Sequence, residues 1–406
     1  MRLSVVIVTC NRRAALRATL DRLAENASLP HDSMEVIIVD NGSTDGTHAE
    51  AQRNDLDIRL IARPRNEGVS ARNHAFAVAR GEYLLLIDDD SYPIGDAVPR
   101  SIAHLEVQPK CAAVVGRIEL PDGRLEASAL PSVIANGAVV LRKSVIDQVG
   151  GFPTDFFRQA EEYDLSFRIW NAGCTIERFE NLRYRHEKVG GNRSSAMIHR
   201  LDMRNNLVVA DRYLPRPLRR AIRSVWTLRY GSLAQHAGHA SAALAGRCAA
   251  RLQAWRECFA PRPVLAPPAV EAIFGYDRQA REVSDWAASN HIRRVLIADF
   301  GKNIHATWFA CRAAGLCALA VVDDHPAFAS IRYRSLPIVT TAAGPRLDPD
   351  GIVLANVNPA QVEQRLAALI EAFDCPVLTF WRPRLLGGAP VSSDPKRAGM
   401  FRSDAA

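Results

Sequence analysis

Short apolar runs alternate with polar loops along the first quarter of the chain. The runs consist of β-branched and aliphatic residues, which is typical of buried strands in a parallel sheet. Amphipathic segments between them have the spacing of helices. The predicted strands span residues 3–8, 35–39, 58–62 and 84–87, and the predicted helices span residues 14–23 and 70–80. Strand, helix and strand in turn, with a polar loop after each strand, predict a doubly wound α/β layer that binds a nucleotide.

The strand at residues 84–87 ends in three consecutive carboxylates, Asp88, Asp89 and Asp90. Ligands of open α/β sheets bind at the carboxyl ends of the strands, so these acids are expected at the site. Adjacent carboxylates repel one another, and a hard divalent cation such as Mg²⁺ or Mn²⁺ would offset that repulsion. A solvated acidic turn is the alternative, but the buried strand in front of the acids favours a site.

Three further motifs occur in the order typical of one enzyme family. They are Ser-Val-Val-Ile-Val-Thr-Cys-Asn-Arg from Ser4, Val-Asp-Asn-Gly-Ser-Thr-Asp-Gly-Thr from Val39, and Asn-Glu-Gly-Val-Ser-Ala-Arg-Asn from Asn66. Together they resemble the large family 2 of inverting glycosyltransferases with the GT-A fold. The Asp88-Asp89-Asp90 triplet is similar to the Asp-x-Asp element of that family. The resemblance covers about residues 1–215 and says little about which sugar is transferred.

The resemblance implies a role for each matching residue. Thr9 and Asp40 would line the nucleoside pocket, with Asp40 accepting a hydrogen bond from N3–H of uracil or thymine. Arg72 would lie beside the base, Asp88 near the ribose, and Asp90 on the metal that holds the diphosphate. The other candidates are Asn66, Gly68, Asp89 and Arg193 on the donor side and His186 on the metal or diphosphate. Turn and capping roles remain the alternative for Asp40, Asn66 and Gly68, and a structural role remains open for His186.

Inverting sugar transfer also needs a carboxylate that takes the proton of the attacking hydroxyl. Residues 133–142 resemble the acceptor-side strand of the family, and a helix is predicted from Glu161 onward. The family usually has Glu-Asp at this helix start, where the second acid is the base. Here the pair is Glu161-Glu162, so Glu162 falls on the base position and Glu161 remains the second candidate. An acidic first helical turn would account for only one of the two carboxylates.

The second half of the chain differs in composition. Residues 215–268 predict a basic helical linker that ends at a proline cluster. Its arginines alternate with apolar residues at helical spacing, so it can lie on an anionic membrane or pack on the catalytic domain. Residues 269–386 resemble a small Rossmann-like domain in which a Gly-x-Gly-x-x-Gly turn is expected. Asp299 and Ile304 replace two of those glycines, which predicts loss of dinucleotide binding.

Length and composition agree with this division into domains. A chain of 406 residues with 48% hydrophobic and 23% charged residues is typical of a globular protein with two domains. The eight cysteines form no Cys-x-x-Cys pair, which argues against a zinc site or a disulfide framework. No apolar run approaches the length of a membrane span, and the chain opens directly into a strand. We therefore expect a cytoplasmic protein, with peripheral contact at the inner face of the membrane left open.

The predicted fold class is α/β, with a GT-A core and a second, smaller Rossmann-like domain. The predicted domains are a catalytic domain at 1–214, the linker at 215–268, the Rossmann-like domain at 269–386 and a disordered tail at 387–406. The predicted function is metal-assisted transfer of a sugar from a UDP- or dTDP-sugar to a hydroxyl of a glycan or lipid-linked acceptor. The formal charge of +7 suits the phosphates of such a donor or an acidic membrane, and we expect no nucleic-acid partner. The alternatives are an NAD-dependent sugar-nucleotide oxidoreductase or epimerase, and a non-catalytic scaffold that binds sugar nucleotides.

Overall fold

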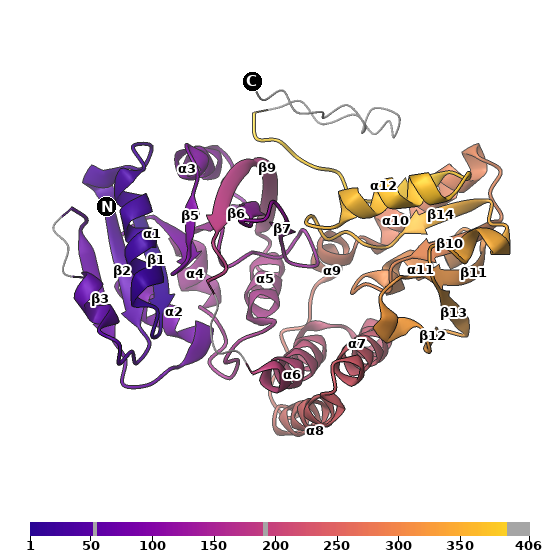
Figure 1. Cartoon of the computed structure of the whole chain (residues 1–406), viewed down its shortest axis with the longest axis horizontal. Helices are drawn as coiled ribbons and strands as arrows, with labels where there is room; N and C mark the ends of the chain where they lie inside the picture. Colours follow the sequence, from indigo (N-terminus) through magenta and orange to yellow (C-terminus); the bar gives the residue numbers. More distant parts are fainter. Residues whose placement is uncertain (52–54, 190–193, 388–406) are drawn as a thin grey trace.

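The computed structural model describes residues 1–51, 55–189 and 194–387, which form two sheets joined by a group of helices (Figure 1). The first sheet has the strand order β3-β2-β1-β4-β8-β6-β9-β5, with β7 beside β6. Its strands are β1 (Leu3–Thr9), β2 (Met34–Asp40), β3 (Ile58–Ala62), β4 (Tyr83–Asp88), β5 (Ser91–Pro93), β6 (Cys111–Glu119), β7 (Leu125–Glu126), β8 (Val139–Arg142) and β9 (Thr175–His186). Strands β1 to β4 are parallel, so the polar loops after β1, β2 and β4 meet at one edge.

The helices of the first half are α1 (Arg13–Glu25), α2 (Arg72–Val78), α3 (Ala97–Val107), α4 (Lys143–Val149) and α5 (Glu161–Asn171). The predicted helix at 70–80 begins as a 3₁₀ turn over Gly68–Ala71 and continues as α2. The predicted strand at 133–142 is wrong in its first half, because only Val139–Arg142 pairs in the sheet. The backbone turns before it, where the Ala138 N–H donates to the Ala135 carbonyl.

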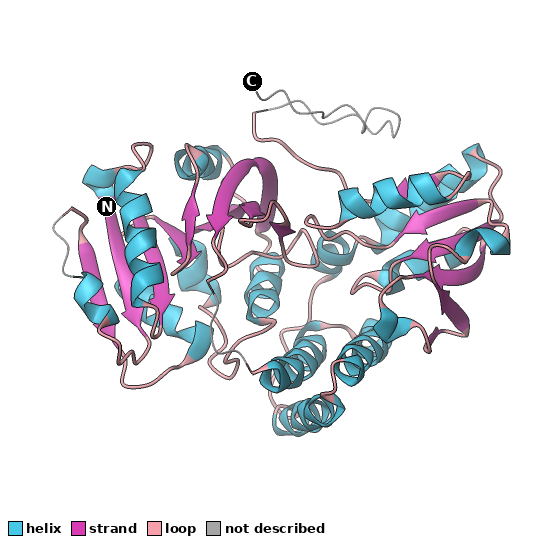
Figure 2. Ribbon diagram, viewed as in Figure 1, coloured by secondary structure: helices cyan, strands magenta, loops and turns pink. Residues whose placement is uncertain are grey.

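The second sheet has the order β12-β13-β11-β10-β14-β15, and every pair except β12 with β13 is parallel. Its strands are β10 (Arg294–Ala298), β11 (Cys317–Val322), β12 (Arg332–Tyr333), β13 (Leu336–Val339), β14 (Gly351–Leu354) and β15 (Val377–Thr379). Its helices are α9 (Pro267–Phe274), α10 (Tyr276–Ser289), α11 (Ile304–Ala313) and α12 (Val362–Ala372). The predicted fold class, with its smaller second α/β domain, is confirmed (Figure 2). The short pair β12–β13 was not predicted.

Three helices form a group at the lower side of the molecule in Figure 1, where the two halves meet: α6 (Ser195–Tyr213), α7 (Arg216–His236) and α8 (Ala240–Arg256). The apolar face of α7, which includes Val225 and Trp226, is buried inside the molecule. This face therefore packs on the protein, as one of the two predicted alternatives has it. No described helix combines the length and apolar character that a membrane crossing needs, and contact with a membrane surface stays a prediction.

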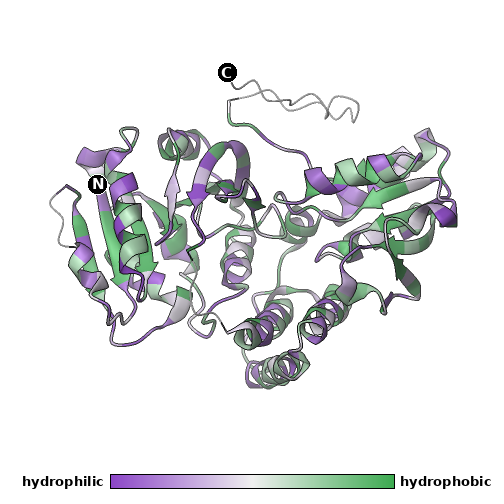
Figure 3. Ribbon diagram, in the orientation of Figure 1, coloured by the Kyte–Doolittle hydropathy of each residue, from purple (hydrophilic) through white to green (hydrophobic). Residues whose placement is uncertain are grey.

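The apolar core is not divided at the predicted linker. One cluster of buried side chains runs from Phe167 on α5 through Trp226 on α7 to Val295 and Ile297 on β10. The rings of Phe167 and Phe274 meet edge to face at 6.1 Å between centroids, which joins α5 to α9. Apolar strands lie inside both halves (Figure 3). The second domain is therefore packed against the part of the first half that contains α5, and its position is fixed by a shared core.

Candidate active site

Arg12, in the loop between β1 and α1, pairs with two of the three acids that follow β4. Its guanidinium nitrogens lie 3.0 Å from Asp89 Oδ1 and 2.5 Å from Asp90 Oδ2. The Thr9 hydroxyl donates to Asp89 Oδ2 at 2.7 Å, so both oxygens of Asp89 contact the protein itself. Burial raises the pKa of Asp89 to about 7, although Arg12 and Thr9 oppose the shift. Asp89 therefore stabilises the loops around the site, and its predicted contact with the donor stays a prediction.

His186, the last residue of β9, links Asp90 to Glu126. Its Nε2 lies 3.1 Å from Asp90 Oδ1, and its Nδ1 lies 2.8 Å from Glu126 Oε2. Burial disfavours the charged imidazole, but these two contacts outweigh burial and raise the pKa of His186 to about 9. Burial also works against the charge of Asp90, yet His186 and Arg12 lower its pKa to about 2. At neutral pH, two cations therefore neutralise Asp90.

Asp88 differs from its two neighbours because its side chain is 37% exposed and lines the cavity. Arg72 holds one of its oxygens at 2.7 Å. Ligand atoms of Asp88, Asp90 and His186 all lie within 4.8 Å of one another. Two carboxylates and an imidazole are a donor set that Mg²⁺ or Mn²⁺ accepts, once His186 has given up its proton. The two residues predicted for the metal thus come together, with Asp88 as a third.

Some of the donor-side candidates line the cavity and others do not. Asn66, Gly68, Thr9 and Arg72 all line the cavity. Arg72 is buried and donates to Asp88 Oδ1 and to the Ile87 carbonyl. Its predicted place beside the base stays a prediction.

Asp40 lies next to Thr9 in the sheet register but does not line the cavity. One of its carboxylate oxygens accepts a hydrogen bond from the Ser43 N–H at 2.9 Å. Its predicted contact with the base therefore stays a prediction. Arg193 lies outside the described residues, so its predicted role also stays a prediction.

The predicted acceptor side contributes Glu161 and Glu162 to the same cavity, at the start of α5. Asn136 Nδ2 donates to Glu161 Oε1 at 3.1 Å, while Oε2 is buried without a hydrogen-bond partner among the described residues. Burial and then the charge of Glu162 raise the pKa of Glu161 above its ordinary value. Burial also raises the pKa of Glu162, and the Lys302 ammonium opposes that shift. Such carboxylates bind a proton more tightly than exposed ones, which suits proton transfer near neutral pH.

A strained turn directs these two acids into the cavity. Gln159 and Ala160, which directly precede them, both have positive φ angles, 71° and 61°. A non-glycine residue in this region costs about 1 kcal/mol or more, so the surroundings must hold it. Asn205 on α6 does so by donating to the carbonyls of Arg158 and Gln159, at 2.8 and 2.9 Å. Helix α6 therefore fixes the direction of the first turn of α5.

The cavity that joins these groups has a volume of about 1460 Å³. A pocket for one small ligand typically has about 300–1000 Å³. The larger volume leaves room for more than one small ligand. The metal-ligand set and the glutamate pair both line this one space.

Four residues of the site were not predicted: Arg12, Glu126, Asn136 and Lys302. Arg12 lies three residues after the end of β1. Its place at the carboxyl edge of the sheet could therefore have indicated that it belongs to the site. Glu126 ends the two-residue strand β7, and Asn136 lies in the turn before β8, so both elements are too short for a periodic pattern to indicate where these side chains point. Lys302 belongs to the second domain, and no sequence spacing relates it to Glu162.

Comparison with known proteins identifies the first part of the chain. Residues 4–158 match the pattern of "Glycosyl transferase family 2". These residues belong to glycosyl transferase family 2. The second domain lies outside that match.

Several relatives align with this family 2 domain. The "Probable glycosyltransferase YdaM" of Bacillus subtilis is 26% identical over 207 residues, which are 44% of this chain and 49% of that protein. The "Poly(ribitol-phosphate) beta-N-acetylglucosaminyltransferase TarS" of Staphylococcus aureus is 34% identical over 96 residues, 23% of this chain and 17% of that protein. The chain thus spans about half or less of the length of these two relatives. The solved structure of S. aureus TarS 1–349 with UDP-GlcNAc overlays with a TM-score of 0.48 at 18% identity, covering 78% of this chain and 93% of that chain.

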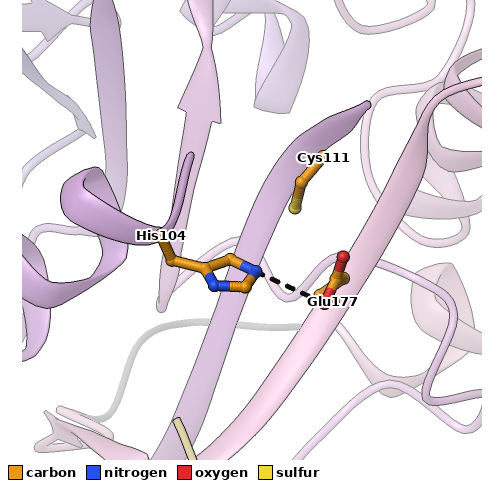
Figure 4. A group of neighbouring side chains, drawn as sticks. All are labelled: His104, Cys111 and Glu177. Atoms are coloured by element: carbon orange, nitrogen blue, oxygen red, sulfur yellow. Dashed lines mark ion pairs between the residues drawn. The ribbon is translucent and has the colours of Figure 1, made fainter. Parts of the chain in front are cut away.

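A second group of possible metal ligands lies away from the cavity of the family 2 domain. His104 on α3, Cys111 on β6 and Glu177 on β9 point toward one another (Figure 4). His104 Nε2 is 3.3 Å from Glu177 Oε2, but Arg384 also holds that oxygen, at 2.7 Å. Burial raises the pKa of the Cys111 thiol to about 12, so it remains protonated. These contacts favour a structural ion pair at this place over a metal site.

Gly68 offers a test of the donor side. It has φ +68°, and a Cβ there would stand 1.9 Å from the Phe157 carbonyl oxygen. Gly68→Ala should therefore displace the loop beneath the cavity, lower the free energy of unfolding and weaken UDP binding. Gly123 has φ +82° with open space around it, so Gly123→Ala should cost only about 1–2 kcal/mol and leave UDP binding unchanged. Denaturant unfolding and titration calorimetry measure both effects; equal losses in the two variants would contradict the assignment.

Proposed function

We propose that this chain is an inverting glycosyltransferase. It would move a sugar from a UDP- or dTDP-sugar to a hydroxyl of a glycan or lipid-linked acceptor in a single displacement. The observation that carries the proposal is that one cavity is lined by both the Asp88–Asp90–His186 set and the Glu161–Glu162 pair. The aligned TarS proteins carry "Poly(ribitol-phosphate) beta-N-acetylglucosaminyltransferase" as their name, which supports a UDP-sugar donor and a hydroxyl-bearing polymer as acceptor.

The residues divide the chemistry between them. Asp88, Asp90 and His186 would hold Mg²⁺ or Mn²⁺, which when bound supplies positive charge for the leaving diphosphate. Glu162 accepts the proton of the acceptor hydroxyl while the hydroxyl oxygen forms a bond to the anomeric carbon. The bond between that carbon and the diphosphate oxygen breaks on the opposite side. The configuration at the anomeric carbon is therefore inverted.

The contacts of the two glutamates support Glu162 as the base. Glu161 is held by Asn136, and the charges of Arg72 and Asp88 act on it, which relates it to the donor side. Glu162 is subject to the charge of Lys302 instead. A cation beside a carboxylate favours its ionised form, which a base requires. Glu161 would then be a buried acid that helps to orient the donor.

The first rival function, NAD-dependent oxidation or epimerisation, would require the Gly-rich turn of the second domain. Asp299 stands there with φ +69°, as a glycine at this position would. Its carboxylate, however, is taken up by Arg365 at 2.7 Å and Asn356 at 2.9 Å. A buried acid in the place of a pyrophosphate argues against dinucleotide binding. The second rival, a non-catalytic scaffold, would not require the strained turn that directs Glu161 and Glu162 into the cavity.

A panel of sugar nucleotides tests the proposal most broadly. With Mn²⁺ present, the matching UDP- or dTDP-sugar should stabilise the protein by about 2.7 kcal/mol at a hundred times its Kd. Asp90→Asn should remove the part of this stabilisation that depends on Mn²⁺, because the donor set loses a charged ligand. Asp147→Asn is the control and should behave as the wild type, because the Asp147 side chain on α4 is exposed and lies outside the cavity. Thermal unfolding measures the shift; an Asp90→Asn variant that keeps the full Mn²⁺ effect would contradict the metal assignment.

Exchange of each glutamate separates the two carboxylates. Glu162→Gln should lower kcat by about a hundredfold or more while donor affinity stays nearly unchanged, because only proton removal is lost. Glu161→Gln should keep more of kcat and alter donor binding more. Release of UDP measured alongside donor affinity distinguishes the two. The reverse pattern would move the role of base to Glu161.

A further inference from the structure

The second domain reaches into the transferase cavity through a single turn. Residues 299–303 connect β10 to α11, and Lys302 within this turn lines the cavity. Trp226 Nε1 on α7 donates to the Lys302 carbonyl at 3.2 Å, and the Arg229 guanidinium donates to the Phe300 carbonyl. The turn that stands in place of the Gly-rich loop is thus fixed to the first half of the chain.

Four neighbouring side chains surround the ammonium group of Lys302. Its Nζ donates to Asn206 Oδ1 on α6 at 2.7 Å. The same nitrogen lies 3.6 Å from the ring centroid of Tyr163, 5.2 Å from that of Trp226 and 5.8 Å from that of Tyr230. Aromatic faces attract a cation at these distances.

The charges around this ammonium are mostly negative. Glu162 and Asp202 both line the cavity with Lys302. Burial lowers the pKa of Lys302, and the charges of these two carboxylates oppose that shift. Lys302 makes no ion pair within 4.0 Å of a carboxylate in the described part of the chain, so it acts on Glu162 across the cavity and not by direct contact.

We propose that Lys302 is a positioning residue that the second domain supplies to the transferase site, where it keeps Glu162 in the carboxylate form that accepts the proton of the acceptor hydroxyl. This inference rests on the proposed function. It gives the second domain a role in the reaction, because Lys302 stands in the very turn that no longer has the glycines of a dinucleotide site.

Several titratable or charged groups surround Glu162 and Lys302, and each can affect the pH dependence of the reaction. Glu162 is faced by Glu161 on its own helix, by Asp202 on α6 and by Lys302. Lys302 is also subject to the charge of Arg229 on α7, and its cage includes the phenols of Tyr163 and Tyr230. His199 acts on Asp202. Among these groups, Lys302 is the one whose charge lowers the pKa of Glu162.

The test is the pH profile of the full chain carrying Lys302→Met. The probe reaction is the slow hydrolysis of UDP-GlcNAc with Mn²⁺, followed by UDP release from about pH 5 to about pH 9. Loss of the cation raises the pKa of Glu162, so the acid limb of the profile should move to higher pH by about one unit. UDP affinity should stay within about twofold of the wild type. Lys302→Arg, which keeps the charge, should restore much of the wild-type limb.

Controls separate this effect from a loss of folding. Lys143→Met removes a lysine on α4, outside the cavity, and should leave the profile unchanged. Thermal unfolding shows whether Lys302→Met is folded; if it is not, the position of the limb in Lys302→Arg and in Asn206→Ala, which frees Nζ, decides. The limb should move to higher pH in Lys302→Met and, to a smaller extent, in Asn206→Ala. An acid limb that stays unshifted in both of these variants, when folded, would overturn the inference. If the wild type releases no nucleoside diphosphate from any UDP- or dTDP-sugar, the proposed function itself fails.

Discussion

The site depends on positive groups that compensate the buried carboxylates at the carboxyl end of β4. Asp89 and Asp90 are both nearly fully buried, and burial of unpaired carboxylates is among the most costly arrangements in a protein. Arg12 and protonated His186 provide that compensation. Arg12 lies in the loop after β1 and His186 ends β9, so the two residues are far apart in the sequence, and the acids can be accommodated only once the sheet is complete. Of these two acids, Asp90 lies close enough to Asp88 and His186 to share a divalent cation with them, and such a cation would replace part of the internal positive charge.

A second requirement acts on the acceptor side of the cavity. The turn at Gln159 and Ala160 is strained and must be held from outside. Helix α6 does this through Asn205, and one helical position further along it Asn206 holds Lys302. A single helix thus couples the direction of the glutamate pair to the position of the second domain. The shared apolar core makes this coupling rigid, since no gap separates the two halves between α5, α7 and β10.

Much of the fold could be predicted because its elements are locally encoded. The strand at 58–62 was predicted with its observed bounds, and the acid triplet was placed correctly at the end of β4. The apolar periodicity fixes such elements, whereas partners across the sheet are set by tertiary packing. Arg12 as the counter-ion of Asp90 and the pairing of His186 with Glu126 were therefore missed.

The start of β8 and the role of the second domain show the other limits. Residues 133–138 are apolar enough to predict a strand, but they turn because the Ala138 N–H closes on the Ala135 carbonyl. The turn where a Gly-rich loop was expected lies at residues 299–303, between β10 and α11, and Asp299 within it has a positive φ. Loss of dinucleotide binding at this turn stays a prediction. That the same turn extends Lys302 toward Glu162 could not be predicted, because it depends on how two domains pack.

The central claim is a single displacement between the metal-ligand set and the glutamate pair. The most direct test is the anomeric configuration of the first product formed from an α-linked UDP-sugar, followed by proton NMR before mutarotation. A single displacement requires that the β-anomer of the released or transferred sugar accumulates first. First formation of the α-anomer would show retention and would contradict the account.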